Sequence, residues 1–200
     1  AMIAAQVAQF DHLSKGRYLL GVGPGGLGSD FELLKLSDRD VRNEMMLESI
    51  DTMQKIWSQD APYSIPGKYW DVNITDFLYE ELGIGEMLKT FQKPHPPICL
   101  SIVTPHSPSA TMAGIRGWQP VSANFIQARY IRSHWDAYAE GVKSIGKEPD
   151  PDNWRIARSI LVTDSDSEAD EYLSNPDCGL HFYFHYFRRM YSARGRLEML

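Results

Sequence analysis

The sequence has few cysteines, no long apolar run and no concentration of positive charge, and each absence excludes a class of protein. Two cysteines in 200 residues, Cys99 and Cys178, exclude a disulfide-rich scaffold. Cys99 lies in an apolar stretch, which predicts a small buried side chain rather than a disulfide partner. No apolar run approaches the roughly 20 residues that a membrane-spanning helix needs. With no secretory signal in view, we expect a cytoplasmic protein without a membrane partner.

The charge pattern also argues against a nucleic-acid partner. The formal net charge is -6, and the 20 lysines and arginines are dispersed along the chain. The densest basic group is short and lies near the end of the sequence, at Arg188, Arg189, Arg194 and Arg196. An acidic chain of this kind is typical of proteins that bind small molecules or other proteins.

The apolar and aromatic content is high enough for one folded domain with a substantial core. The sequence opens inside a helical pattern, with no cap and no lead-in strand, and it stops while the pattern is still helical. We therefore expect a single domain over residues 1–200 that is incomplete at both ends.

Hydrophobic periodicity predicts alternating helices and strands. Helical spacing covers residues 2–14, 127–145 and 180–191, and the second of these has Tyr130, His134, Tyr138 and Val142 in register. A helix with a capping box at Ser37 and Asp40 runs to about Trp57. Two further helices begin near Ser107, followed by Pro108, and at Ser165. Buried strands are predicted at residues 17–23, 97–103, 119–125 and 154–164. This alternation predicts an α/β fold with a parallel sheet. Residues 58–97 are expected to be a long, mostly irregular insertion or lid.

A glycine-rich stretch, "LGVGPGGL", follows the first predicted strand. Gly21, Gly23 and Gly26 fit the G-x-G-x-x-G pattern of dinucleotide-binding loops. That pattern needs a helix at the third glycine and an acidic residue after the second strand. Here about a dozen residues of predicted loop, with room for one helical turn, separate Gly26 from the helix after Ser37, and the acidic residue is missing. The alternatives are a loop after a barrel strand, where glycine lets the backbone approach a flat ring, or a surface turn.

Two stretches of the sequence resemble the bacterial luciferase-like flavin monooxygenases. "AAQVAQFDHLSKGRYLLGVGPGGLGSDFELL", with "RNEMMLESIDTMQKIW" after it, resembles the family's helix ending in "LD-x-L-S-x-G-R", its glycine strand and its next helix. "KPHPPICLSIVTPHSPSATMAGIRGW" resembles the looser segment that opens a later strand–helix unit. The residues that match the first pattern are Asp11, Leu13, Ser14, Gly16, Arg17, Gly21, Gly23, Asp30, Phe31, Ile56 and Trp57.

The resemblance implies a partial TIM (β/α)8 barrel with parallel strands and a long insertion. It also implies a monooxygenase that uses reduced FMN as co-substrate and oxidises an apolar or aromatic small molecule with O2, through a flavin hydroperoxide. A flavin reductase would supply the reduced flavin, and a homo- or hetero-dimer is expected. The alternatives are a deazaflavin-dependent dehydrogenase on the same fold and a truncated relative that binds flavin without catalysis.

The family's cofactor site maps onto two parts of this sequence. Gly21 and Gly23 would lie near the flavin ring. The loop and helix start from His106 to Thr111 would hold the phosphate, and free N–H groups at a helix start suit an anion. The residues predicted to bind the cofactor are Gly21, Gly23, His106, Ser107, Ser109 and Thr111. Ser107 has an alternative role as a simple N-cap.

The sequence departs from luciferase itself in ways that leave the catalytic residue unknown. Luciferase has a reactive cysteine followed by an arginine, where this chain has Gly23 and Pro24. This departure argues against light emission but not against monooxygenation. The luciferase-type catalytic histidine has no counterpart in this sequence.

Three aromatic or imidazole side chains are predicted to line a substrate pocket: Phe31, Trp70 and His181. Trp70 lies in the long insertion, where it would cap an apolar substrate or pin its own loop. His181 and His185 are four residues apart and would share one face of a helix, but no third ligand stands at metal-site spacing. We therefore expect no metal, and instead either a buried aromatic helix or part of the substrate pocket wall.

Overall fold

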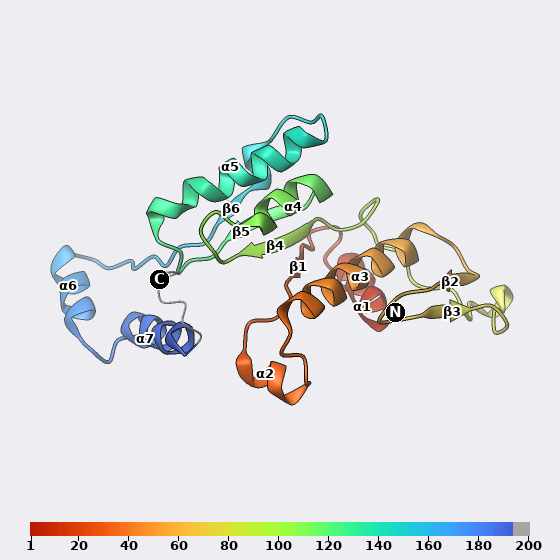
Figure 1. Ribbon diagram of the computed structural model, residues 1–200, viewed down its shortest axis with the longest axis horizontal. Coiled ribbons are helices and arrows are strands. Elements are labelled where there is room, and N and C mark those ends of the chain that lie inside the picture. The colour runs from red at the N-terminus through yellow and green to blue at the C-terminus, as the bar shows by residue number, and fades with distance from the viewer. Residues whose placement is uncertain (194–200) are drawn as a thin grey trace. The chain divides into compact units, whose positions relative to one another are not determined.

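The computed structural model describes residues 1–193, and the chain divides into two units, Ala1–Cys99 and Leu100–Leu200 (Figure 1). None of the helices within residues 1–193 combines the length and the apolar character needed to cross a bilayer. Both cysteines are buried and neither forms a disulfide within residues 1–193, as expected for Cys99. The predicted single domain stays a prediction, because each unit is described by itself below.

The first unit contains a helix pair, three short strands and a long connecting region. Its elements are α1 (Met2–Leu13), β1 (Leu20–Val22), α2 (Gly28–Leu33), α3 (Arg39–Ser58), β2 (Tyr63–Ile65), β3 (Val72–Ile74) and the 3-10 helix η1 (Glu80–Leu82). The apolar face of α1, at Ala4, Val7 and Ala8, is buried against α3. The indole Nε1 of Trp57 on α3 donates to the Ala4 carbonyl at 3.1 Å, which fixes the two helices together.

The turn from α1 to β1 contains the most specific residues of the family resemblance, and their roles are structural. Asp11 is fully buried, and its carboxylate accepts the backbone N–H of Gln92 at 2.8 Å and the Gln92 side-chain amide at 2.7 Å. Gly16 has a φ of +76°, and a Cβ there would lie 3.1 Å from the Phe91 ring. Leu20 N then donates to Pro97 O at 2.9 Å, which places β1 beside the start of β4 (Ile98–Ile102).

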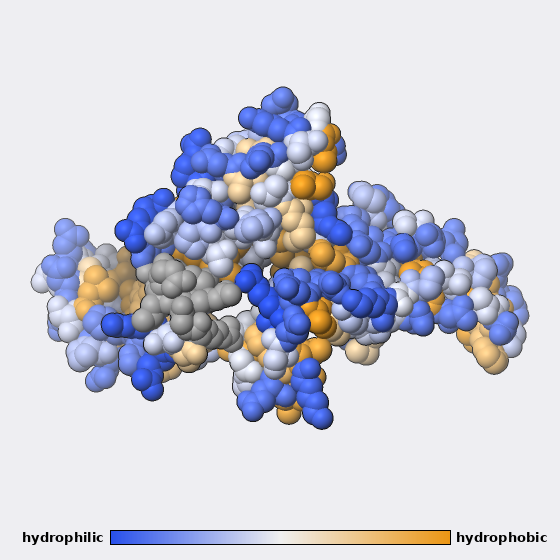
Figure 2. Space-filling model, viewed as in Figure 1, coloured by the Kyte–Doolittle hydropathy of each residue, from blue (hydrophilic) through white to orange (hydrophobic). Residues whose placement is uncertain are grey.

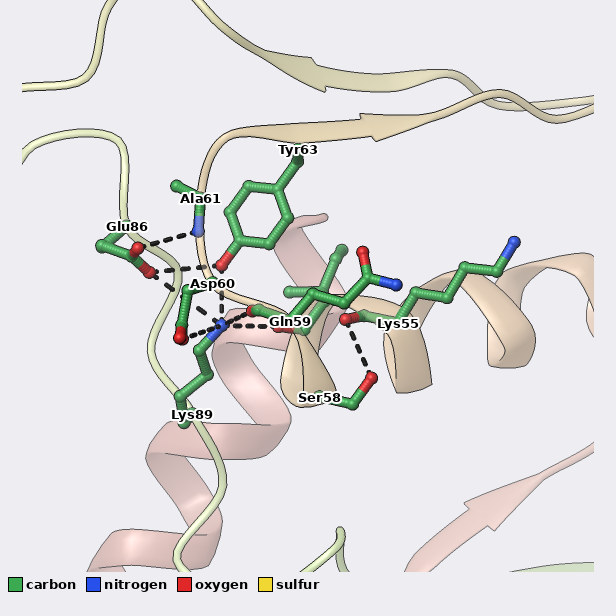
Figure 3. A network of polar contacts seen from close by, with 9 residues as sticks. Lys55, Ser58, Gln59, Asp60, Ala61, Tyr63, Glu86 and Lys89 are labelled. Atoms are coloured by element: carbon green, nitrogen blue, oxygen red, sulfur yellow. Dashed lines mark hydrogen bonds and ion pairs between the residues drawn. The ribbon is translucent and has the colours of Figure 1, made fainter.

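A polar network centred on Lys89 closes the C-terminal end of α3 (Figure 3). The Lys89 ammonium donates to the carbonyls of Ile56 and Gln59 and to the Tyr63 hydroxyl. Glu86 accepts from that hydroxyl at 3.3 Å and lies 3.9 Å from Lys89. A cation at the C-terminal end of a helix satisfies carbonyls that have no partner within the helix. Lys89 therefore ties the segment before β4 to α3.

The second unit is a strand–helix repeat. The strands β4, β5 (Gln119–Ser122) and β6 (Arg155–Ile156) lie in that order, and β5 and β6 are parallel, with Val121 opposite Arg155. Helices α4 (Pro108–Arg116) and α5 (Ala128–Ser144) lie side by side and pack against β5 (Figure 1). A short 3-10 helix, η2 (Pro151–Asn153), precedes β6, and α6 (Asp166–Ser174) and α7 (Gly179–Ser192) follow it.

The packing of α4 against α5 depends on two glycines. A Cβ at Gly114 would lie 2.4 Å from the Tyr138 carbonyl oxygen, and one at Gly141 would lie 2.1 Å from the Thr111 carbonyl oxygen. No side chain fits at either position, so the two backbones touch there. The predicted register of α5 is confirmed, because His134, Tyr138 and Val142 are buried and Tyr130 is half-buried.

Two predictions about elements were wrong. The first is the start of α3: its N-cap is Asp38, whose carboxylate accepts from Asp40 N and Val41 N, and Ser37 lies outside the helix. Residues 58–97 are mostly irregular, as predicted, although β2 and β3 form an antiparallel pair within them. The loop predicted after Gly26 contains the six-residue helix α2, where the sequence left room for one helical turn.

The strand predicted at residues 154–164 is the second error. Only Arg155 and Ile156 form a strand, β6, and the last backbone bond to β5 runs from Ala157 N to Ser122 O at 2.9 Å. Ile160 and Val162, which the apolar pattern placed in a buried strand, are 82% and 86% exposed. Figure 2 shows other apolar side chains at the surface among the hydrophilic ones.

Candidate functional site

The predicted phosphate-binding residues lie in the loop between β4 and α4 and on the first turn of α4, after the carboxyl end of a strand. In (β/α) barrels the loops at that end form the active site. Ser107 is the N-cap of α4, as its position before Pro108 predicts, and its Oγ accepts Ser109 N at 3.3 Å. Ser107 is buried, so capping, the alternative role considered above, is what its side chain performs here.

The start of α4 presents hydroxyls rather than free amides. Pro108 has no N–H, Ser109 N is held by Ser107 Oγ, and Ala110 N donates to Ser107 O at 3.0 Å. The expectation of several free N–H groups is therefore wrong. The Ser109 and Thr111 hydroxyls are half-buried and make no hydrogen bond within residues 1–193. These two groups, at the positive end of the helix dipole, are suited to bind an anion.

His106 has a left-handed backbone that its neighbours hold in place. Its φ is +49°, which is uncommon for a residue other than glycine and costs free energy unless the surroundings compensate. The His106 backbone N–H donates to Ser133 Oγ on α5 at 3.0 Å. The Ser133 hydroxyl in turn donates to the Tyr130 carbonyl at 2.6 Å. The His106 imidazole is exposed, and its ring meets the Tyr130 ring edge to face.

A buried imidazole on α5, which the sequence placed in the core without a role, reaches the same loop. His134 Nε2 lies 2.9 Å from the Thr104 carbonyl oxygen, which can only accept, so Nε2 carries the proton. His134 Nδ1 then accepts the Ser122 hydroxyl at 2.8 Å, and the Trp154 indole donates to that hydroxyl oxygen at 3.0 Å. Burial, the largest effect, lowers the pKa of His134, so the imidazole is neutral at physiological pH.

The glycine strand of the first unit leaves its backbone open. A Cβ added at Gly21 or Gly23 would meet no atom within 4 Å, and neither residue needs a positive φ. The fold of the described chain therefore gives no steric reason for glycine at these positions. A group that is not part of the chain, such as a flat ring close to the backbone, would give one.

Phe31, Trp70 and His181, the residues predicted to line a substrate pocket, have different surroundings. Phe31 on α2 is half-buried, and the Arg42 guanidinium lies 3.6 Å from its ring centre. His181 is exposed on α7, whose predicted helical span is confirmed. The alternative of a buried aromatic helix is wrong, because Tyr191 is the only buried residue within Gly179–Ser192. The structure tests none of the three assignments.

Trp70 is 41% exposed and lies in a loop attached to Glu48 of α3. The Glu48 carboxylate accepts the backbone N–H groups of Lys68, Tyr69 and Trp70 at 2.8 to 3.0 Å. Desolvation raises the pKa of Glu48, but the three backbone donors outweigh it and leave that pKa below its usual 4.5. Backbone groups of the loop, not the Trp70 side chain, therefore pin it to α3, and neither role considered for Trp70 is tested.

These features define an α/β protein of the barrel type, with candidate residues placed just after its strands. The chain belongs to the luciferase-like monooxygenase family, whose model matches residues 1–199. The sequence prediction of this family is confirmed.

Named relatives and a solved structure agree with this assignment. The chain is 30% identical over 172 residues to 2,5-diketocamphane 1,2-monooxygenase 1 of Pseudomonas putida, covering 84% of this chain and 47% of that protein. It is 31% identical over 182 residues to the second such enzyme of that organism, with the same coverage. The chain thus spans about half the length of these curated relatives.

The oxygenating constituent of 3,6-diketocamphane monooxygenase from Pseudomonas putida, a type II Baeyer–Villiger enzyme solved with FMN, has a similar fold. Its TM-score is 0.81 at 24% identity, with 99% of this chain and 54% of that chain covered. The likeness bears out the luciferase-like barrel fold predicted from the sequence.

Proposed function

We propose that this chain forms part of an FMN-dependent monooxygenase that oxidises an apolar or aromatic small molecule with O2. The observation that carries the proposal is the family match over residues 1–199, together with about 30% identity to two diketocamphane monooxygenases. Because those relatives are named for a bicyclic diketone, an apolar cyclic ketone is the first substrate to test. Bound reduced FMN supplies the electrons that activate O2.

The residues of this chain that fit a flavin have separate tasks. The Ser109 and Thr111 hydroxyls donate to the phosphate, and Ser107 holds the start of α4 in place for them. Gly21 and Gly23 leave their backbone open to the ring. A separate flavin reductase belongs to the proposal, since one related protein is described as an oxygenating constituent. A dimer is proposed from the family resemblance alone.

A titration of the purified chain with FMN and with riboflavin, each reduced and oxidised, tests the cofactor site. Ser109→Ala and Thr111→Val are expected to weaken FMN binding about fivefold to tenfold each and to leave riboflavin binding unchanged, since only FMN has a phosphate. Ser167→Ala is the matched control, because Ser167 occupies the same position after the Ser165 N-cap of α6 that Ser109 occupies in α4. Equal losses for the control would contradict the phosphate site.

A substitution at Gly23 tests whether this part of the chain lies beside the flavin ring. Gly23→Val adds a side chain where the described structure has room, so its thermal stability is expected to stay at the wild-type value. Both FMN and riboflavin are expected to bind more weakly, because the two share the ring. Unchanged binding of both would remove Gly23 from the site.

Turnover is tested with a flavin reductase, FMN, an apolar cyclic ketone and isotopically labelled O2. A product heavier by one labelled oxygen atom supports the monooxygenase. Tight binding of a deazaflavin in place of FMN would favour the deazaflavin-dependent dehydrogenase instead. Flavin binding without oxygen uptake would favour the non-enzymatic relative.

A further inference from the structure

Two consecutive residues of α5 reach the loop that precedes α4. His134 donates to the Thr104 carbonyl at 2.9 Å, and Ser133 accepts the His106 N–H at 3.0 Å. Thr104 and His106 flank Pro105, so the two bonds fix both peptide groups around it. The loop is therefore held by α5 immediately before the Ser107 N-cap.

Each of these two bonds has a fixed direction. Trp154 can only donate to Ser122 Oγ, so the Ser122 proton points to His134 Nδ1 and the single remaining imidazole proton points to Thr104. His134 and Ser122 are both fully buried, so water cannot replace these partners. Ser133 donates its own proton to the Tyr130 carbonyl and is left to accept from His106.

The backbone conformation of His106 explains why the loop needs these two hydrogen bonds from α5. With a φ of +49° the residue lies in the left-handed region, and a conformation of this kind persists only where the surrounding structure imposes it. A relaxed His106 would rotate the peptide that leads into Ser107 and move the start of α4. The Ser109 and Thr111 hydroxyls would move with it.

We propose that His134 and Ser133 are positioning residues for phosphate recognition by the β4–α4 loop. This inference rests on the proposed function, since the phosphate in question is that of the proposed flavin cofactor. His134 and Ser133 do not touch the phosphate themselves. They set the backbone from Thr104 to His106, and this backbone sets the direction of the donors on the first turn of α4.

The test compares dissociation constants for FMN and riboflavin across α5 variants of the purified chain. Ser133→Ala and His134→Leu are expected to raise the FMN constant about fivefold to tenfold and to leave the riboflavin constant within about twofold. His134→Gln keeps an N–H donor and is expected to recover most of the FMN affinity. Ser144→Ala is the matched control, because the Ser144 hydroxyl donates to the carbonyl three residues before it, as Ser133 does, but contacts no loop.

The preference for FMN over riboflavin separates positioning from a merely structural role. Equal weakening of both flavins, or no change in either, would overturn the inference. Ser133→Ala removes one oxygen atom, so it provides a folded variant even where His134→Leu unfolds the chain. A wild-type chain that binds both flavins equally would overturn the phosphate site and this inference together. A wild-type preference that the α5 variants retain would overturn only the inference.

Discussion

At the scale of single residues, the buried imidazole of His134 makes stability depend on pH. Burial, aided by the nearby charges of His106 and Arg158, lowers the pKa of His134 below 6.5, although its bond to Thr104 opposes the shift. Below about pH 6.5 the unfolded chain therefore binds a proton that the folded chain excludes, so the free energy of unfolding falls as the pH drops.

We expect the melting temperature to fall between about pH 7.5 and about pH 5.5, and to fall less in His134→Gln, which does not titrate there. Thermal melts across this range check the difference between the two proteins. Because both proteins contain the other histidines, the contributions of those histidines to the pH dependence cancel in the comparison. Parallel curves would show that His134 protonates as easily in the folded chain as in the unfolded one.

Lys89 is a second residue whose role follows from its contacts. Lys89→Met keeps an apolar stem of similar length but leaves the carbonyls at the end of α3 without their cation (Figure 3). A loss of about 1 to 3 kcal/mol in the free energy of unfolding is expected, measured by denaturant titration. Lys93→Met, at an exposed position nearby, serves as the control. A loss as large in the control would mean that charge, not the network, matters.

At the scale of elements, the contact between α4 and α5 is the least tolerant of change. Gly141→Ala places a methyl group 2.1 Å from the Thr111 carbonyl oxygen, so the helices must separate. Such overpacking costs about 1 to 3 kcal/mol, and the same is expected of Gly114→Ala. Chemical denaturation measures both, with Ile115→Ala at an exposed position of α4 for comparison. Wild-type stability in the glycine variants would show that the helices adjust freely.

The sequence predicted the longer elements well and the short ones poorly. Helices α1, α5 and α7 follow apolar or aromatic stripes, and Ser107 before Pro108 marks the start of α4. The pair β2 and β3 has only three residues in each strand, too few for an alternating pattern to stand out between prolines. Ser37 was chosen over Asp38 as the N-cap because both residue types cap helices, and only geometry separates them.

The candidate site was predictable where it repeats a family pattern and not where it depends on tertiary contacts. Ser107, Ser109 and Thr111 followed from the resemblance. The roles of Ser133 and His134 on α5 could not be predicted in this way. A histidine on an apolar stripe predicts a buried imidazole, but it does not show which carbonyl the imidazole will contact. Only the fold brings Thr104 within reach of His134, 30 residues further along the chain.

At the scale of the whole molecule, the chain covers about half of its curated relatives and exposes apolar side chains. Ile160 and Val162 are more than four-fifths exposed, and surfaces of this kind associate. We expect the purified chain to self-associate as its concentration rises, as measured by light scattering after gel filtration. Ile160→Thr with Val162→Thr is expected to lower the association, and the paired change Thr163→Ser with Ser167→Thr is not. A monomer at all concentrations would contradict this expectation.

The burial of both cysteines has a practical consequence for labelling chemistry. Cys99 and Cys178 are 8% and 4% exposed, so neither thiol is readily accessible to a bulky maleimide in the folded chain. Gly23→Cys would introduce one exposed thiol, at a position where the structure has room for a side chain. A fluorophore attached there would report from a single known point, without removal of the native cysteines.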